Sequence, residues 1–409
     1  MEKLKFTKYI DEAIQKEIDD ARIAGAQIAL YKLGDESGKI NEFYRKCYGY
    51  ADKENKKKTQ EDTIYRLFSM TKLITSVAVM ILYERGKIDL LMPLSHYLPE
   101  FKDMMVLDEN GERPAKSQIT VQQVMNMTAG LVYPDMSFKA GMKMQEAYDN
   151  VLYANWKSGK EMNTEEVVRL IAKQPLEFEP GERWRYSTCA DVAGRLVEVA
   201  SGMKFSEFLK KEIFIPLGMT DTDFYVPKEK QDRFSVMYDY DWEKMQLKVA
   251  GDNFLGLGDY LNPPKFESGG AGLVTTVDDY AKFACMLANM GEYGTNGERI
   301  LSSNTVDFMT TNALTDEQKK YFCWEQLKGY GYANFFRTLE DNVAGCTNAT
   351  HDFGWDGYMG DYVSIDAVSG VVILYMQQKF GGCDNSLIRR IRNIVYGGID
   401  EIEKIVQKV

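Results

Sequence analysis

One segment restricts the fold of this chain more than any other, residues 66 to 87, RLFSMTKLITSVAVMILYERGK. Between Leu73 and Leu82 its side chains are apolar or small on every side of a helix, so the helix must be buried. Gly86 is placed to end it. The chain has no run of about 18 uncharged apolar residues, so we expect this helix in the interior of a globular protein rather than across a membrane.

A serine and a lysine lie at the start of this helix, three residues apart. Ser69 and Lys72 therefore share one face of it. Free backbone N–H groups and the positive end of the helix dipole favour developing negative charge near Ser69. A desolvated lysine gives up its proton more readily than one in water and can then act as a base toward a hydroxyl. The plain alternative is a capping serine beside a lysine that reaches solvent.

The rest of the chain changes pattern three times. Strand-like segments at both ends enclose a long helical stretch, and a Gly/Pro-rich connection covers residues 251–274. This order predicts a sheet domain formed by both termini, residues 1–75 and 255–409, with a mostly helical domain of residues 76–254 inserted in it. The strand-like segments are residues 24–34, 43–52, 329–337, 361–367 and 370–378, and Thr164 is expected to cap a helix that follows it.

Composition excludes several classes of function. The net charge of −11 argues against nucleic acid or an anionic membrane as a partner. Six cysteines without a C-x-x-C pair and only two histidines predict neither a metal site nor a Ser-His-Asp triad, and no G-x-S-x-G elbow occurs. The N-terminus lacks the apolar core of a secretory signal, so a cytoplasmic location is expected unless a leader was removed.

Longer segments carry a family resemblance. They are GYADKENKKKTQEDTIYRLFSMTK, VQQVMNMTAGL, FEPGERWRYSTCADVAGRLVEVASGMK, ESGGAGLVTTVDDYAKFACMLANMG and FGWDGYMGDYVSIDAVSGVVILYMQQ. In this order they resemble the serine β-lactamase and penicillin-binding-protein superfamily, most closely class C β-lactamases and family VIII carboxylesterases. The resemblance implies an α+β fold in which helices flank an antiparallel sheet, with the active site between the sheet and the inserted helical domain. It also implies an acyl-enzyme on Ser69, without a cofactor or metal.

The resemblance assigns a second catalytic position to a tyrosine after a Pro-Gly turn, which matches Tyr186 in FEPGERWRYSTCAD. A phenol near a cationic lysine can exchange a proton with the serine or the leaving group. The family usually has Y-x-N here, whereas this chain has Thr188 at the third position, which we assign to substrate binding. Literal Y-x-N strings lie elsewhere, in helix-like or strand-like context, at Tyr148, Tyr153 and Tyr332.

The third motif, K-T-G in β-lactamases, is matched in order by Trp355-Asp-Gly357. This is similar to the W-x-G variant of family VIII esterases. The resemblance implies an oxyanion hole formed by the backbone N–H groups of Ser69 and Tyr358, with Trp355 as an aromatic wall and Gly357 allowing close approach of the substrate. Tryptophan cannot attract the carboxylate of a β-lactam as lysine does.

Together these motifs predict a serine hydrolase that forms an acyl-enzyme, and the tryptophan favours a carboxylesterase acting on a small-molecule acyl ester. A β-lactamase, a D-amino-acid amidase or peptidase, or an acyltransferase on the same fold remain open. A non-catalytic binding relative is the alternative from another class. The sequence does not determine the oligomeric state or the physiological substrate.

Overall fold

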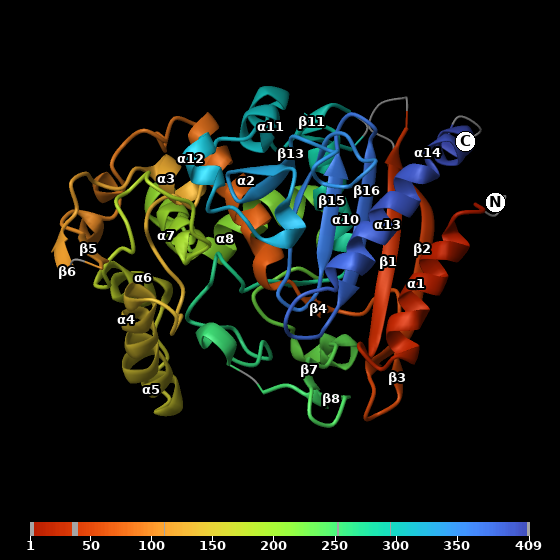
Figure 1. The fold of residues 1–409 in the computed structure, drawn as a ribbon, viewed down its shortest axis with the longest axis horizontal. Helices are drawn as coiled ribbons and strands as arrows, with labels where there is room; N and C mark the ends of the chain where they lie inside the picture. The colour runs from red at the N-terminus through yellow and green to blue at the C-terminus, as the bar shows by residue number, and fades with distance from the viewer. Residues whose placement is uncertain (1–3, 35–39, 110, 252, 295, 407–409) are drawn as a thin grey trace.

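A single large antiparallel sheet positions everything else in the molecule (Figure 1). The computed structural model describes residues 4–34, 40–109, 111–251, 253–294 and 296–406. The sheet has eight strands in the order β12-β13-β14-β15-β16-β1-β2-β3. Their bounds are Tyr330–Ala333, Phe336–Leu339, Asp352–Asp356, Tyr362–Asp366, Val371–Gln377, Gly25–Leu33, Ile40–Asp52 and Lys57–Lys58.

Two neighbouring strands in the interior of the sheet, β1 and β16, come from opposite ends of the chain. β1 pairs with β16 in antiparallel register, with Ala26 opposite Gln377 and Lys32 opposite Val371. Every residue of β16 is buried, and its alternate side chains enter two different apolar cores. A strand covered on both faces needs apolar residues at every position, which explains the unbroken run VVILYM.

Helices cover both faces of this sheet. On one face α1 (Thr7–Asp19), α13 (Asn385–Gly397) and α14 (Ile399–Val406) pack on Ile28, Ile373 and their neighbours. On the other face α10 (Val277–Ala288) packs against β1, β15 and β16, and its core continues into α2 (Thr71–Glu84). The predicted antiparallel sheet flanked by helices is confirmed. The boundaries at residues 75/76 and 254/255 stay predictions.

The buried helix expected after Ser69 is α2. Every residue from Thr71 to Leu82 is buried, and Gly86 follows its end with a φ of +65°. This helix packs mainly on α7 (Cys189–Ser201) and also on α8 (Phe205–Leu209). The other helices of this part of the chain are α3 (Val121–Met125), α4 (Lys139–Ala147), α5 (Ala154–Lys157), α6 (Thr164–Ala172) and α9 (Ile215–Leu217). Figure 1 shows α3 to α8 gathered on the side of the molecule away from α1 and α14.

The remaining elements are short. Small two-stranded sheets pair β4 with β9, β5 with β6, β7 with β8 and β10 with β11. These strands span Tyr65–Arg66, Val274–Thr275, Met105–Asp108, Gly111–Pro114, Tyr238–Asp241, Gln246–Val249, Glu292–Tyr293 and Glu298–Arg299, and two more helices are α11 (Ser303–Thr310) and α12 (Asp316–Lys319). Within the described residues, no helix combines the length and apolar character needed to cross a bilayer.

Two local expectations are wrong. Asn163, not Thr164, caps α6, because the Asn163 side chain accepts from the Glu166 N–H while the Thr164 hydroxyl accepts from the Glu267 N–H. The strand-like segment 329–337 is a hairpin of β12 and β13, because Asn334 and Phe335 both adopt positive φ and reverse the chain. The sequence also predicts a turn at residues 34–39 between the first two strand-like segments, and residues 35–39 of it lie outside the described ranges.

Candidate active site

Ser69 lies in a 3-10 turn, Phe68–Met70, that leads directly into α2. Just before the turn, β4 pairs with β9 and the Leu67 N–H donates to the Leu273 carbonyl, which holds the segment beside the Gly270 loop. Phe68 adopts a φ of +43°, an unfavourable conformation for a bulky residue. Its ring is 2% exposed and packs among Phe254, Tyr260, Tyr358 and Phe380, which keeps the strained turn in place.

Lys72 is fully buried, and its ammonium joins three chain segments. Nζ donates to the Gly270 carbonyl at 2.7 Å, the Ser69 Oγ at 3.1 Å and the Tyr133 hydroxyl at 3.2 Å. Three acceptors match the three N–H bonds of an ammonium group. The alternative in which Lys72 reaches solvent is therefore wrong.

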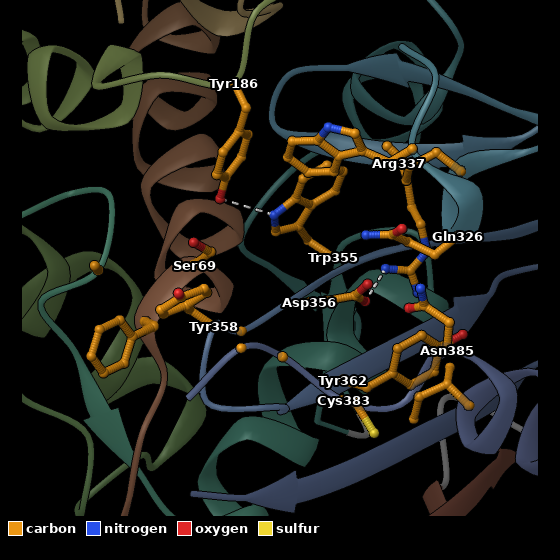
Figure 2. Close-up of a pocket in the computed structure, with 18 of the residues that line it drawn as sticks. Ser69, Tyr186, Gln326, Arg337, Trp355, Asp356, Tyr358, Tyr362, Cys383 and Asn385 are labelled. Atoms are coloured by element: carbon orange, nitrogen blue, oxygen red, sulfur yellow. Dashed lines mark hydrogen bonds and ion pairs between the residues drawn. The ribbon is translucent and has the colours of Figure 1, made fainter. Parts of the chain in front are cut away.

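Tyr186 lines the same cavity as Ser69 and Trp355, and its hydroxyl points toward both (Figure 2). Its ring stacks on Trp355 with centroids 5.4 Å apart, and the Lys72 Nζ lies 4.7 Å from its centroid. The Tyr186 hydroxyl accepts a hydrogen bond of 3.1 Å from the Trp355 Nε1. Trp355 is thus more than the apolar wall expected from the sequence, because it also supplies a donor to the tyrosine oxygen.

The backbone N–H groups of Ser69 and Tyr358 lie on segments that meet at Gly357. A Cβ at Gly357 would lie 2.7 Å from the Leu67 carbonyl oxygen, so glycine is required for the turn after β14 to approach the segment before Ser69. This contact within the protein also calls for glycine, and the close approach of a substrate at Gly357 stays a prediction. Neither the Ser69 nor the Tyr358 N–H donates a hydrogen bond to another described residue.

Thr188 does not reach the cavity. It is fully buried at the start of α7, its hydroxyl donates to the Val132 carbonyl at 3.4 Å, and it is absent from the cavity lining. The substrate-binding role predicted for it does not fit this position. The serine-lysine pair at Ser201 and Lys204 also lies away from the cavity, at the end of α7 where Gly202 has a φ of +72°.

Tyr133 is a site residue that the sequence analysis missed. It lines the cavity, its ring lies 5.7 Å from that of Tyr186, and its hydroxyl accepts from Lys72. Burial raises the pKa of Tyr133 well above its usual range, and the charge of Asp191 raises it further. The motif segment VQQVMNMTAGL could have pointed to Tyr133, because it ends two residues before this tyrosine.

The cavity in front of Ser69 has a volume of about 540 Å³. Aromatic rings form its walls near the serine: Phe68, Phe254 and Tyr358 on one side, and Tyr186, Trp324 and Trp355 on the other. Its far end is polar (Figure 2). There Arg337 donates to Asp356 at 2.6 Å, and burial raises the pKa of the Asp356 carboxyl although the Arg337 charge opposes this rise.

A serine, a lysine and two tyrosines therefore converge on one aromatic cavity, beside two backbone N–H groups that point to no other described residue. This fold and this convergence place the chain among the serine hydrolases. The chain belongs to the β-lactamase family, whose sequence model matches residues 10–396.

Known relatives extend over nearly the whole chain. Protein Rv1367c of Mycobacterium tuberculosis is 28% identical over 383 residues, covering 90% of this chain and 89% of its own. Esterase EstB of Burkholderia gladioli is 26% identical over 401 residues, covering 95% and 94%. The structure of EstCE1, described as a hydrolase with promiscuous acyltransferase activity, matches with a TM-score of 0.78 at 23% identity, covering 96% of this chain and 98% of EstCE1. It shows the shared fold.

Proposed function

We propose that this protein is a carboxylesterase that hydrolyses short acyl esters through an acyl-enzyme on Ser69. The observation that carries the proposal is the hydrogen bond from the Lys72 Nζ to the Ser69 Oγ, at the edge of an aromatic cavity. The likeness to Esterase EstB over 95% of the chain supports the ester as substrate.

In the proposed reaction the Ser69 Oγ attacks the ester carbonyl carbon. Its proton passes to Tyr186, whose oxygen accepts a hydrogen bond from the Trp355 N–H and whose ring lies beside the Lys72 ammonium. The Ser69 and Tyr358 N–H groups stabilise the tetrahedral oxyanion, each contributing about 3 kcal/mol. Tyr186 returns the proton to the leaving alcohol, and water activated at the same oxygen then releases the acid.

The walls near Ser69 favour an ester over a β-lactam. Trp355 and Asp356 occupy the strand where β-lactamases of the resembled class carry a lysine, and an indole and a carboxylate do not attract a substrate carboxylate there. A non-catalytic role would leave the Ser69–Lys72–Tyr133 contacts without a purpose other than stability.

The test compares wild type, Ser69→Ala and Ser201→Ala on p-nitrophenyl butyrate, with nitrocefin as a second substrate. Ser201 and Lys204 have the same spacing as Ser69 and Lys72, so Ser201→Ala is the matched control. We expect Ser69→Ala to lose at least about 10⁴-fold in kcat, Ser201→Ala to keep wild-type activity, and nitrocefin to be slow. Fast nitrocefin turnover would overturn the ester preference. Equal trace activity in wild type and Ser69→Ala would overturn the enzyme assignment.

Acyl transfer is a second candidate, because EstCE1, which shares the fold, is described as having promiscuous acyltransferase activity. Adding an alcohol acceptor to the same assay separates the two. Transfer predicts faster p-nitrophenol release and an ester product, whereas hydrolysis predicts the free acid and an unchanged rate.

A further inference from the structure

Asp191 is a buried carboxylate close to the site, and the mechanism above does not use it. It lies in the first turn of α7 and is 4% exposed. Its Oδ1 accepts from the Ser268 hydroxyl at 2.5 Å and from the Gly270 N–H at 3.0 Å. Among the described residues, no lysine, arginine or histidine forms an ion pair with it. A buried carboxylate is costly to keep charged without a counter-charge.

Lys72 is a buried cation that has no direct anionic partner among the described residues. Its ammonium is fully buried, and its three acceptors, a carbonyl and two hydroxyls, are all neutral. A buried cation is as costly as a buried anion when neither has a partner of opposite sign. Within the described part of the chain, each of the two charges therefore lacks a direct ion pair.

The peptide of Gly270 connects the two groups. Its N–H donates to Asp191, while its carbonyl accepts from Lys72. A Cβ on Gly270 would lie 3.0 Å from the Tyr133 hydroxyl and 3.1 Å from both carboxylate oxygens of Asp191. A side chain at Gly270 would therefore press on both Tyr133 and Asp191, at a residue that bonds to Asp191 and Lys72.

We propose that Asp191 is the counter-charge of Lys72, acting through the Gly270 peptide as a positioning residue that keeps Lys72 a cation aimed at Ser69. The proposal rests on the proposed function and deepens it, because a cationic Lys72 leaves Tyr186 as the group that takes the serine proton. Asp191 does not touch the reacting atoms.

Burial keeps three side chains around this pair, Tyr133, Tyr148 and Cys189, neutral over the working range of pH. Lys72 faces Ser69, Tyr133 and Tyr186, and Asp191 is surrounded by Tyr133, Tyr148 and Cys189. Burial raises the pKa of Tyr133 and Tyr148 well above their usual range and raises the pKa of Cys189 to about 12. Burial also raises the pKa of Asp191, while the Ser268 hydrogen bond and the Lys72 charge oppose this rise. Asp191 is therefore a carboxylate that interacts with the Lys72 charge and is linked to it through Gly270.

A thermal double-mutant cycle tests the pairing without any use of activity. The variants are Asp191→Asn, Lys72→Met and both together. If the two charges balance each other, each single variant leaves one uncompensated charge, and the double variant melts about 2–4 °C above the value expected from adding the two single effects. Additivity within about 1 °C would overturn the proposal.

A labelling experiment then tests the effect on the reaction. The rate at which a fluorophosphonate modifies the full-length protein is measured from pH 5 to 9 by intact mass. The acidic limb is the fall in labelling rate toward low pH. Removing the negative charge of Asp191 eases proton loss from groups nearby, so in Asp191→Asn this limb should lie about one pH unit lower. The highest labelling rate should also fall at least about tenfold. Ser268→Ala keeps the carboxylate but removes the Ser268 hydrogen bond to Asp191 and the bonds from the Gly270 and Ala271 N–H groups, and it should leave the limb in place.

The two experiments separate the failures. An unshifted limb in Asp191→Asn with a slower rate would reduce Asp191 to a structural residue and overturn the proposal. A wild type that no phosphonate modifies would overturn the proposed function, while the thermal cycle would still decide whether Asp191 balances Lys72.

Discussion

The two ends of the cavity differ in how their polar groups are used. At the reaction centre, the Ser69, Tyr133 and Tyr186 hydroxyls each accept a hydrogen bond from Lys72 or Trp355. At the far end, the Tyr362 hydroxyl and the Arg392 Nε are buried without a hydrogen-bond partner among the described residues. The first arrangement is set before a substrate arrives, whereas the second leaves hydrogen-bonding capacity unused. The polar groups near Ser69 are thus held in place more firmly than the polar groups at the far end, which we expect to contact the substrate.

The comparison is sharpened most by changing the two tyrosines of the reaction centre separately. We expect Tyr186→Phe to lower kcat for p-nitrophenyl butyrate about 10²–10³-fold, because it removes the proton carrier. Tyr133→Phe should cost about tenfold, because it removes only one acceptor of Lys72. Steady-state kinetics at pH 7.5 checks both, and a larger loss in Tyr133→Phe than in Tyr186→Phe would reverse the two roles.

Trp355 offers a test of its donor apart from its ring. Trp355→Phe keeps an aromatic wall but removes the N–H that donates to Tyr186. We expect kcat to fall about tenfold, as for the loss of one hydrogen bond to a group that develops charge, with KM changed less than about threefold. A rise in KM with unchanged kcat would show that Trp355 acts as a wall alone.

Asp361 lies in the turn between Tyr358 and β15. Its Oδ2 is buried without a hydrogen-bond partner among the described residues. Burial raises the pKa of Asp361 well above its usual range. Folded Asp361 therefore holds its proton more tightly than the unfolded chain, and its contribution to stability falls as pH rises above about 4. Asp361→Asn removes this loss.

The melting temperatures of wild type and Asp361→Asn, measured from pH 4 to 8, check this sign. The variant should gain about 2 °C on wild type as pH rises, because it no longer buries an unsatisfied charge. A gap that shrinks toward pH 8 would contradict the direction of the pKa shift.

The smallest effect is expected at the far end. Tyr362→Phe removes a buried hydroxyl that has no partner, so the free energy of unfolding should stay equal or rise by up to about 1 kcal/mol. Hydrolysis of p-nitrophenyl butyrate should change less than about twofold, because this short ester does not fill the cavity. A strong loss of activity would show that both ends act as one site.

The sequence predicted much of the fold and the convergence of several site residues, for identifiable reasons. The all-apolar run of α2, the unbroken β16 and the order of the motifs are local or linear signals. Ser69, Tyr186, Trp355 and Tyr358, all named from the motifs, line one cavity, and Lys72 donates a hydrogen bond to Ser69. Their chemical roles stay predictions.

The residues that were missed depend on contacts across the fold. Tyr133 reaches Lys72 from 61 positions away, and Asp191 meets Gly270 across 79. In the sequence Asp191 is only an acidic residue in the first turn of a helix, where such residues are common. Thr188 was assigned by its place in a motif, and the start of α7 turns it inward instead.

The most direct test of the central claim locates the nucleophile. The full-length protein is treated with one equivalent of a fluorophosphonate and digested with trypsin, which releases the peptide LFSMTK, residues 67–72. We predict a single adduct on this peptide at Ser69, absent from Ser69→Ala. An adduct on any other residue, or none in wild type, would contradict the account of Ser69 as an activated serine.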